Sequence, residues 1–129
     1  MTLATALLLP LLLHSSPAAV HVVRMGGGNR FAPAEVHARP GDTLRFVNSR
    51  GGIHNVQFEA DSIPEAARAR LARALPGDKI APLSGPLLLG DDETYDIVIP
   101  ALPPGRYPFL CLPHQTAPMR GVLIVSANP

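Results

Sequence analysis

The segment RYPFLCLPHQTAPMRGVLIVSA, residues 106–127, predicts two β-strands joined by a short loop. Aromatic and β-branched side chains, which favour strands, lie on both sides of that loop. Within it, two prolines fix their backbone φ angles and stiffen the chain. Cys111 ends the first strand, His114 lies on the loop, and Met119 precedes the second strand. Because only seven residues separate Cys111 from Met119, we expect these three side chains around one point.

Short alternating segments continue through the rest of the chain and are separated by turn signals such as RPGD at 39–42. In TLRFVN, residues 43–48, the side chains of Leu44, Phe46 and Asn48 fall on one face of a half-buried strand. The other expected strands are 19–25, 34–38, 54–58 and 94–100. Seven to eight short strands at this spacing predict an all-β fold, a Greek-key β-sandwich.

One segment, DSIPEAARARLARAL at 61–75, predicts a short helix. Ser62 is the expected N-cap, and Glu65 three residues later completes a capping box. The expected apolar face consists of Ala66, Ala67, Leu71, Ala74 and Leu75. The opposite face carries Arg68, Arg70 and Arg73. In the simpler interpretation these arginines are a solvated helix face; in the alternative interpretation they form a docking patch.

The chain opens with MTLATALLLPLLLHSSPAAV, which is apolar from Leu3 to Leu13. This run is short for a bilayer-spanning helix and is broken by a proline, so it predicts an export signal at 1–19, cut near Ala18 or Ala19. No Lys or Arg precedes the apolar run, which leaves a retained anchor or a buried strand as alternatives. Export implies a periplasmic or other extracytoplasmic location, no stable membrane insertion after cleavage, and a single domain at 20–129.

Charge and cysteine content exclude several classes of protein. Eleven basic and ten acidic residues give a formal charge of +1, and no basic block indicates nucleic-acid binding. We expect a monomer. A single Cys forms no internal disulfide, and in an exported protein it indicates a partner chain, a reactive thiol or a metal ligand.

The ligand types around Cys111 favour the metal. A thiolate, an imidazole and a thioether are soft or borderline donors that suit copper, which prefers two imidazoles and a thiolate in a plane with a weak axial methionine. His54, which opens a predicted strand after a Gly-rich loop, is the candidate second imidazole. A lone Cys is usually a small buried hydrophobe, but the conjunction of donors favours a site. His21 and His37 are interpreted as ordinary strand residues.

With this set of candidate ligands, the chain resembles a blue copper protein (cupredoxin) of the plastocyanin type, with pseudoazurin and amicyanin as near relatives. CLPHQTAPM at 111–119 is similar to the family's Cys-x-Pro-His-Gln-x₃-Met ligand loop, and GGIHNVQF at 51–58 to its upstream His-Asn-Val-x-Phe segment. GGGNRFAPAEVHARPGDTLRFVN at 26–48 follows the glycine-rich opening of the family and its Pro-Gly-(Asp/Glu) run. The resemblance covers the chain from about Val20 to Val125.

The resemblance implies one type-1 copper ion bound by His54, Cys111 and His114, with Met119 as the long axial ligand. It implies that Asn55 ties the two ligand loops together and donates toward the sulfur. It also implies single-electron transfer between redox proteins such as cytochromes or oxidoreductases, and no enzymatic activity.

Two positions depart from the family pattern. Leu110 stands where the family commonly has a docking Tyr, and Ile53 where plastocyanins often have Pro. The first departure argues against the acidic-patch contact of photosynthetic plastocyanins. Docking is therefore expected near His114, whose expected apolar surround consists of Leu112, Pro113, Pro118, Ile53 and Phe31.

Two other functions stay open from the sequence. One is a periplasmic copper carrier or metallochaperone with the same fold, although such proteins usually expose several Met or His, and only Met25 and Met119 follow the signal. The other is a purely structural β-sandwich that binds no copper.

Overall fold

The computed structural model describes residues 10, 12, 16–50, 52–116 and 119–127. In this part of the chain the strands are β1 (Val20–Gly26), β2 (Arg30–Ala32), β3 (Glu35–Ala38), β4 (Thr43–Asn48), β5 (Gln57–Phe58), β6 (Thr94–Val98), β7 (Gly105–Leu110) and β8 (Arg120–Val125). The helices are the α-helix α1 (Glu65–Ala74) and two 3₁₀ turns, η1 (Ala60–Ser62) and η2 (Leu112–His114). None of these helices has the length and apolar character needed to cross a bilayer.

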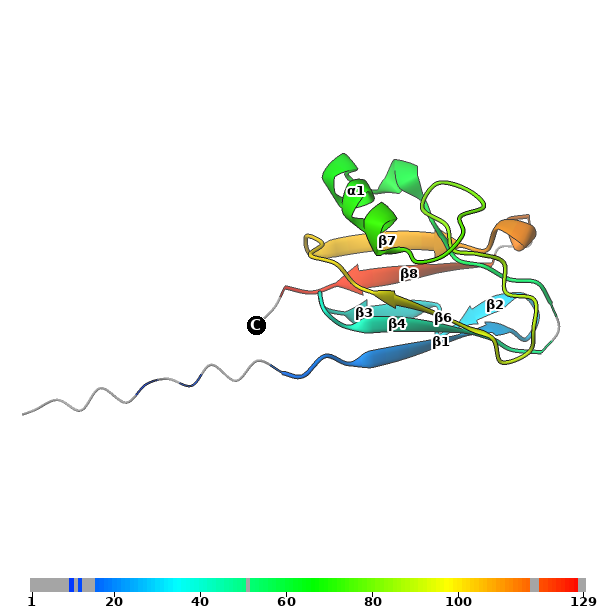
Figure 1. Ribbon diagram of the computed structural model, residues 1–129, viewed down its shortest axis with the longest axis horizontal. Coiled ribbons are helices and arrows are strands. Elements are labelled where there is room, and N and C mark those ends of the chain that lie inside the picture. The colour runs from blue at the N-terminus through cyan, green and yellow to red at the C-terminus, as the bar shows by residue number, and fades with distance from the viewer. Residues whose placement is uncertain (1–9, 11, 13–15, 51, 117–118, 128–129) are drawn as a thin grey trace, which may run out of the picture.

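The strands form two four-stranded sheets, ordered β2-β1-β4-β6 and β3-β8-β7-β5. The chain passes from one sheet to the other at every connection between successive strands except β1–β2 and β7–β8. As a result β1 pairs in parallel with β4, and β3 in parallel with β8. This layered arrangement, visible in Figure 1, confirms the expected all-β sandwich with one short helix.

The interior of the sandwich follows from alternation along the strands. In β4, Leu44 and Phe46 are fully buried while Arg45 between them is exposed. Phe46 meets Phe109 of the opposite sheet edge-to-face, with ring centroids 5.5 Å apart. Gly121 of β8 pairs with Phe109, and a Cβ at residue 121 would lie 2.4 Å from the Phe109 ring. The absence of a side chain at Gly121 therefore leaves room for that ring.

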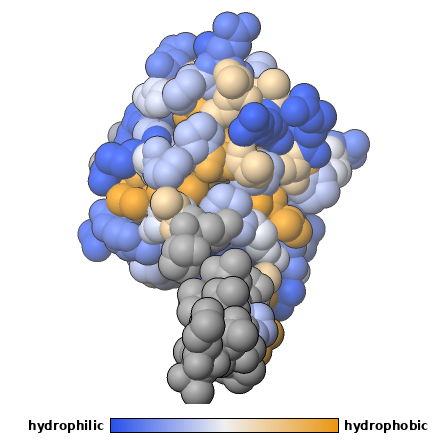
Figure 2. All heavy atoms as spheres, turned by 90° about the vertical axis from the view of Figure 1, so that its left-hand side faces the viewer, coloured by the Kyte–Doolittle hydropathy of each residue, from blue (hydrophilic) through white to orange (hydrophobic). Residues whose placement is uncertain are grey.

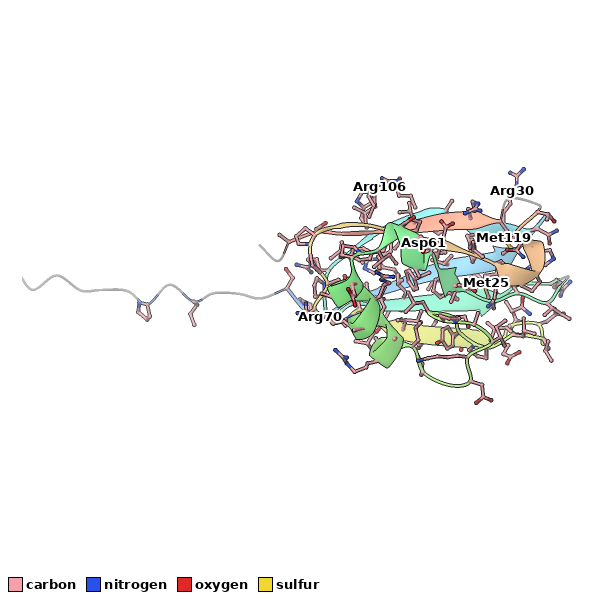
Figure 3. All side chains as sticks on the ribbon, turned by 90° about the horizontal axis from the view of Figure 1, so that it is seen from above. Met25, Arg30, Asp61, Arg70, Arg106 and Met119 are labelled. Atoms are coloured by element: carbon pink, nitrogen blue, oxygen red, sulfur yellow. The ribbon has the colours of Figure 1, made fainter. Side chains whose placement is uncertain are left out.

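The two ends of the sandwich differ. The N-terminal segment enters at the end that Figure 2 faces, where hydrophilic residues cover much of the rim. Figure 3 places Met119 and Arg30 at the opposite end, with Arg70 of α1 at the first. The Cys-His-Met loop therefore lies far from the N-terminal entry of the chain.

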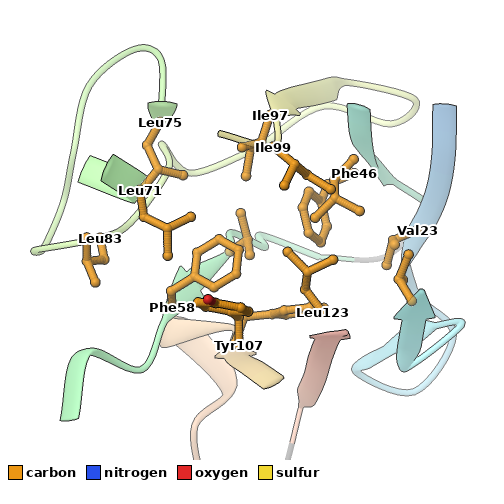
Figure 4. Close-up of a cluster of buried hydrophobic side chains, with 14 of the residues drawn as sticks. Val23, Phe46, Phe58, Leu71, Leu75, Leu83, Ile97, Ile99, Tyr107 and Leu123 are labelled. Carbon is orange, nitrogen blue, oxygen red and sulfur yellow. The ribbon is translucent and has the colours of Figure 1, made fainter. Parts of the chain in front are cut away.

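Helix α1 covers the side of the core between edge strands β5 and β6. Its buried residues Ala67 and Leu71 join the core, together with Leu75 just after the helix. Figure 4 shows Leu71 and Leu75 pointing toward Phe58 and Ile97. Hydrophobic packing across the two edge strands therefore explains why a helix interrupts this β-sandwich.

Two details of the predicted helix are wrong. The N-cap is Pro64 and no side chain caps the helix, because Ser62 instead ends the preceding turn η1. Ala66 is exposed, and the helix starts at Glu65, two residues later than a cap at Ser62 requires. Arg70 donates to the carbonyl of Ala101 and is exposed, in agreement with the solvated-face interpretation.

Strand boundaries shift at two other places. The stretch GGGNRFAP, whose glycines predict only a break, contains strand β2 because Phe31 packs into the core and pairs with Met25. The predicted strand at 54–58 shrinks to β5, since His54 forms an isolated bridge with Leu88 instead. The polypeptide around His54 is thus held by a loop and not by a sheet neighbour.

Candidate metal centre

Three of the four expected ligands come together at one end of the sandwich. The Sγ atom of Cys111 lies 3.7 Å from Nδ1 of His54 and 3.5 Å from Nδ1 of His114. One donor atom from each residue falls within 4.8 Å of the other two. Cys111 follows β7 directly and His114 ends η2, whereas His54 comes from the loop between β4 and β5. The sandwich therefore joins donors 57 residues apart in the chain.

Burial sets the protonation of these donors. Burial lowers the pKa of His54, and repulsion from His114 lowers it further, so the imidazole stays neutral with a free lone pair. Burial raises the pKa of the Cys111 thiol, although backbone N–H groups of Asn55 and His114 hydrogen-bond to the sulfur and partly offset this. A cation bound here would displace the thiol proton and be held by thiolate and neutral imidazoles.

Met119 is fully buried and hydrogen-bonded to the same segment. Its carbonyl accepts a 3.1 Å hydrogen bond from the backbone N–H of Cys111, which closes the loop between them. Figure 3 shows Met119 at the end of the sandwich that carries η2. The thioether is thus enclosed in the same end of the core as Cys111.

Asn55 connects the two ligand-bearing loops. Its Oδ1 accepts a 2.8 Å hydrogen bond from the backbone N–H of Leu112, the residue after Cys111. Its own backbone N–H donates to the Cys111 sulfur. Both contacts agree with the role that the family resemblance implied for Asn55.

Asn48 is a supporting residue that sequence reasoning missed as part of the site. Its Nδ2 lies 3.2 Å from the carbonyl oxygens of Gly52 and Leu88 and 3.0 Å from that of Gly90. The carbonyl of Leu88 also accepts from the backbone N–H of His54. The signal was present in the sequence, because Asn48 occupies a core-facing position of an apolar strand, where a polar side chain needs buried partners.

Gly52 sets the position of the His54 ring. The Nε2 atom of His54 is buried and has no hydrogen-bond partner among the described residues. A Cβ at residue 52 would lie 2.9 Å from this Nε2, so only glycine leaves the ring its present place. With Nε2 packed against Gly52, Nδ1 is the nitrogen that faces the sulfur.

His114 is the one partly exposed donor of the three, and the residues of its expected surround differ in exposure. Ile53 is 48% exposed, Pro113 is exposed and Leu112 is half-buried. The expectation for Phe31 is wrong, because its ring packs edge-to-face against Phe46 and Phe109 inside the core. Pro118 lies outside the described residues.

The two histidines assigned to strands stay apart from this cluster. His21 pairs with Asp42 and His37 with Glu35. Beside the site, Leu110 is buried and lines a shallow pocket together with Glu59 and Asp61. The fold thus brings two acidic residues beside Leu110 that the sequence did not place there, although Glu59 is paired with Arg120.

The donor set fits copper. Two imidazole nitrogens and one sulfur at mutual distances below 4.8 Å, with a buried methionine in the same end of the core, match the ligand types of a type-1 site. No carboxylate joins this cluster in the described part of the chain, as a magnesium or calcium site would require.

Sequence comparisons agree with this geometry. A profile of the family described as "Copper binding proteins, plastocyanin/azurin family" matches residues 18–126. The chain is 34% identical over 107 residues to the chloroplastic plastocyanin of Physcomitrium patens, covering 81% of this chain and 56% of that protein. It is 37% identical over 100 residues to plastocyanin of Vicia faba, covering 78% and 91%. The chain thus spans about half the length of its chloroplastic relatives, 56% and 52% in two of them.

Solved structures show the same fold. The oxidized form of plastocyanin from Dryopteris crassirhizoma superposes with a TM-score of 0.66 at 26% identity, covering 82% of this chain and all of that one (100%). Amicyanin from Paracoccus versutus superposes with a TM-score of 0.56 at 25% identity, covering 86% and 85%.

Proposed function

The chain belongs to the plastocyanin/azurin family of copper-binding proteins, and we propose on this basis that it is a type-1 copper electron carrier that works outside the cytoplasm. His54, Cys111, His114 and Met119 would hold the copper ion. The observation that carries the proposal is the convergence of the two Nδ1 atoms on the Cys111 sulfur, 3.7 and 3.5 Å away.

A bound copper ion would supply a one-electron couple between Cu(I) and Cu(II). The protein's contribution is a cage that keeps its shape. His54 and Cys111 are fully buried, Asn55 ties their loops together, and Gly52 supports the His54 ring. Because these contacts would hold the same side chains in place in both oxidation states, little reorganisation would accompany electron transfer.

Four protein ligands leave no open position for a substrate, so we propose a carrier and not an enzyme. Electrons enter and leave through His114, the partly exposed ligand. The exposed Ile53 and Pro113 beside it form a small apolar contact area, which suits brief encounters with redox proteins such as cytochromes.

The copper-carrier alternative has weaker support. Proteins that hand on Cu(I) usually present several accessible Met or His side chains. Met25 and Met119 are both fully buried here. With these thioethers enclosed, the described surface offers no methionine at which a partner could take the metal.

The test is the absorption spectrum of purified protein after addition of Cu(II). A copper–thiolate bond gives intense charge-transfer colour, so we expect a blue protein and no blue colour in Cys111→Ser. The matched control is His37→Ala, which removes an exposed histidine paired only with Glu35 and should leave the spectrum unchanged. Wild-type protein that binds copper but stays colourless would overturn the type-1 assignment.

The axial assignment has its own measurement. Because the axial ligand tunes the redox potential, Met119→Gln should lower the voltammetric midpoint. A midpoint equal to that of the wild type would show that Met119 is not a ligand, even if the protein is blue.

A further inference from the structure

A buried carboxylate holds the point where the chain enters the sandwich. Asp42, just before β4, is 3% exposed. Its Oδ1 accepts a 2.9 Å hydrogen bond from the backbone nitrogen of Ala19. Its Oδ2 accepts a 3.0 Å hydrogen bond from the backbone nitrogen of Arg39 and lies 2.9 Å from Nε2 of His21. The start of β1 and the turn before β4 thus meet at one carboxyl group.

Ala19 marks the beginning of the folded domain. Both of its backbone groups are hydrogen-bonded, because its carbonyl oxygen accepts a 2.9 Å hydrogen bond from the backbone N–H of Thr43. Residues 16–18, directly before it, are exposed and belong to no strand. Figure 1 shows the chain leading away from the sandwich just before β1. The fold therefore holds Ala19 by both backbone groups, and the residues immediately before it lie on open, extended chain.

From this arrangement we propose that the precursor is cut between Ala18 and Ala19, and that the new α-ammonium group of Ala19 pairs with the Asp42 carboxylate. The inference rests on the proposed export of the protein, and the co-reactant is a leader peptidase of the exporting cell. Water adds across the Ala18–Ala19 peptide bond, so that Ala18 leaves as a carboxylate and the nitrogen of Ala19 takes up protons to become an ammonium.

The local sequence suits this bond better than the next one. Leader peptidases require small residues at the third and first positions before the cut. Cleavage after Ala18 places Ser16 and Ala18 there, whereas cleavage after Ala19 would place Pro17 at the third position. Cleavage after Ala19 would also remove Ala19 itself, the residue that Asp42 and Thr43 hold.

Cleavage changes the donor that Asp42 binds. In the uncut chain the nitrogen of Ala19 is a neutral amide, and the buried carboxylate has His21 as its one titratable partner among the described residues. After the cut the same nitrogen is an ammonium, because α-amino groups have a pKa of about 7.7–8.0. A charge-assisted hydrogen bond is shorter and stronger than a neutral one, and a paired carboxylate is less costly to bury. Removal of the leader therefore stabilises the domain that remains.

In the first experiment residues 1–129 are expressed in an exporting cell, and the intact mass of the exported protein is measured. A mature chain beginning at Ala19 supports the proposal. A chain beginning at Val20 or elsewhere, or an uncut chain, overturns it. The absorption spectrum of the same copper-loaded sample tests the electron-carrier proposal separately, because the metal site lies at the other end of the sandwich. An uncut blue protein would refute this inference alone, and a correctly cut colourless one would refute only the proposed function.

The second experiment tests the ammonium–carboxylate pair. Chains that begin at Ala19 are prepared with a free or an acetylated N-terminus, and their thermal unfolding midpoints are compared at pH 6.5. Acetylation keeps an N–H donor and removes the charge. We expect the free form to unfold about 4–8 °C higher and Asp42→Asn to abolish the difference. Equal midpoints, or a difference that persists in Asp42→Asn, would show that the ammonium does not pair with this carboxylate.

Discussion

Replacement of Asn48 by Ala should weaken both the fold and the loop that carries His54. The side chain of Asn48 is fully buried, and its Nδ2 faces the carbonyls of Gly52, Leu88 and Gly90 at 3.0–3.2 Å. An amide nitrogen has two hydrogens, so two of these carbonyls receive a full hydrogen bond at any time, and alanine leaves all of them without this donor.

The size of the loss follows from those contacts. Each hydrogen bond contributes about 0.5–1.5 kcal/mol net, and a buried carbonyl left unsatisfied costs about 1–3 kcal/mol. We therefore expect Asn48→Ala to lower the free energy of unfolding by about 2–4 kcal/mol. Asn48→Asp should lose at least as much, because a carboxylate of the same shape cannot donate and would face three carbonyl oxygens.

The assay is urea unfolding of the copper-free protein, with native-state hydrogen exchange of the His54 amide as a local probe. That amide donates to the carbonyl of Leu88, which Asn48 also binds, so its exchange should accelerate in the variant. Gln115→Ala, at an exposed amide side chain, is the control and should change little. A loss below about 1 kcal/mol in Asn48→Ala, or wild-type stability in Asn48→Asp at neutral pH, would refute this reasoning.

Three further predictions concern other single positions. Burial raises the pKa of Asp42, but hydrogen bonds from the backbone nitrogens of Ala19 and Arg39 and from the His21 side chain outweigh this effect. The pKa is therefore about 2, below the ordinary 3.8. The depressed pKa stabilises the fold above pH 4, so acid urea titrations should show a loss of about 2 kcal/mol between pH 4 and pH 2 that is absent in Asp42→Asn; parallel curves would contradict it. Gly121→Ala should cost about 1–3 kcal/mol by overpacking, because the new Cβ would lie within 2.4 Å of the buried Phe109 ring, and an unchanged urea midpoint would be the contrary result. Gly52→Ala should displace the His54 ring, and it should weaken the affinity for Cu(II) in competition titrations far more than it alters the stability of the copper-free protein. Equal Cu(II) affinities of variant and wild type would refute this expectation.

The metal site shows how far sequence reasoning reached. CLPHQTAPM keeps Cys111, His114 and Met119 within nine residues, so their proximity follows from a loop too short to separate them. The position of Asn55 beside Leu112 also agreed with the family pattern. The placement of His54 does not follow from a short loop, because its approach to the Cys111 sulfur depends on how the loop before β5 is held.

Elements that depend on packing were harder to predict. Strand β2 lies in a glycine-rich stretch and exists because Phe31 enters the core, which no local propensity shows. The helix begins at Glu65 and not after Ser62, since η1 occupies the residues before it. Local signals thus placed most of the elements, but not β2 and not the start of α1.

By itself, the sequence determined the all-β class, the ligand loop and the apolar alternation of its strands, because each depends on neighbouring residues and a period of two. Only the tertiary structure decided which nitrogen of His54 faces the Cys111 sulfur, that Asn48 braces its loop, and that Asp42 holds Ala19. These contacts join residues 23 to 57 positions apart, and such distant pairs are fixed by the way two sheets pack rather than by any local pattern.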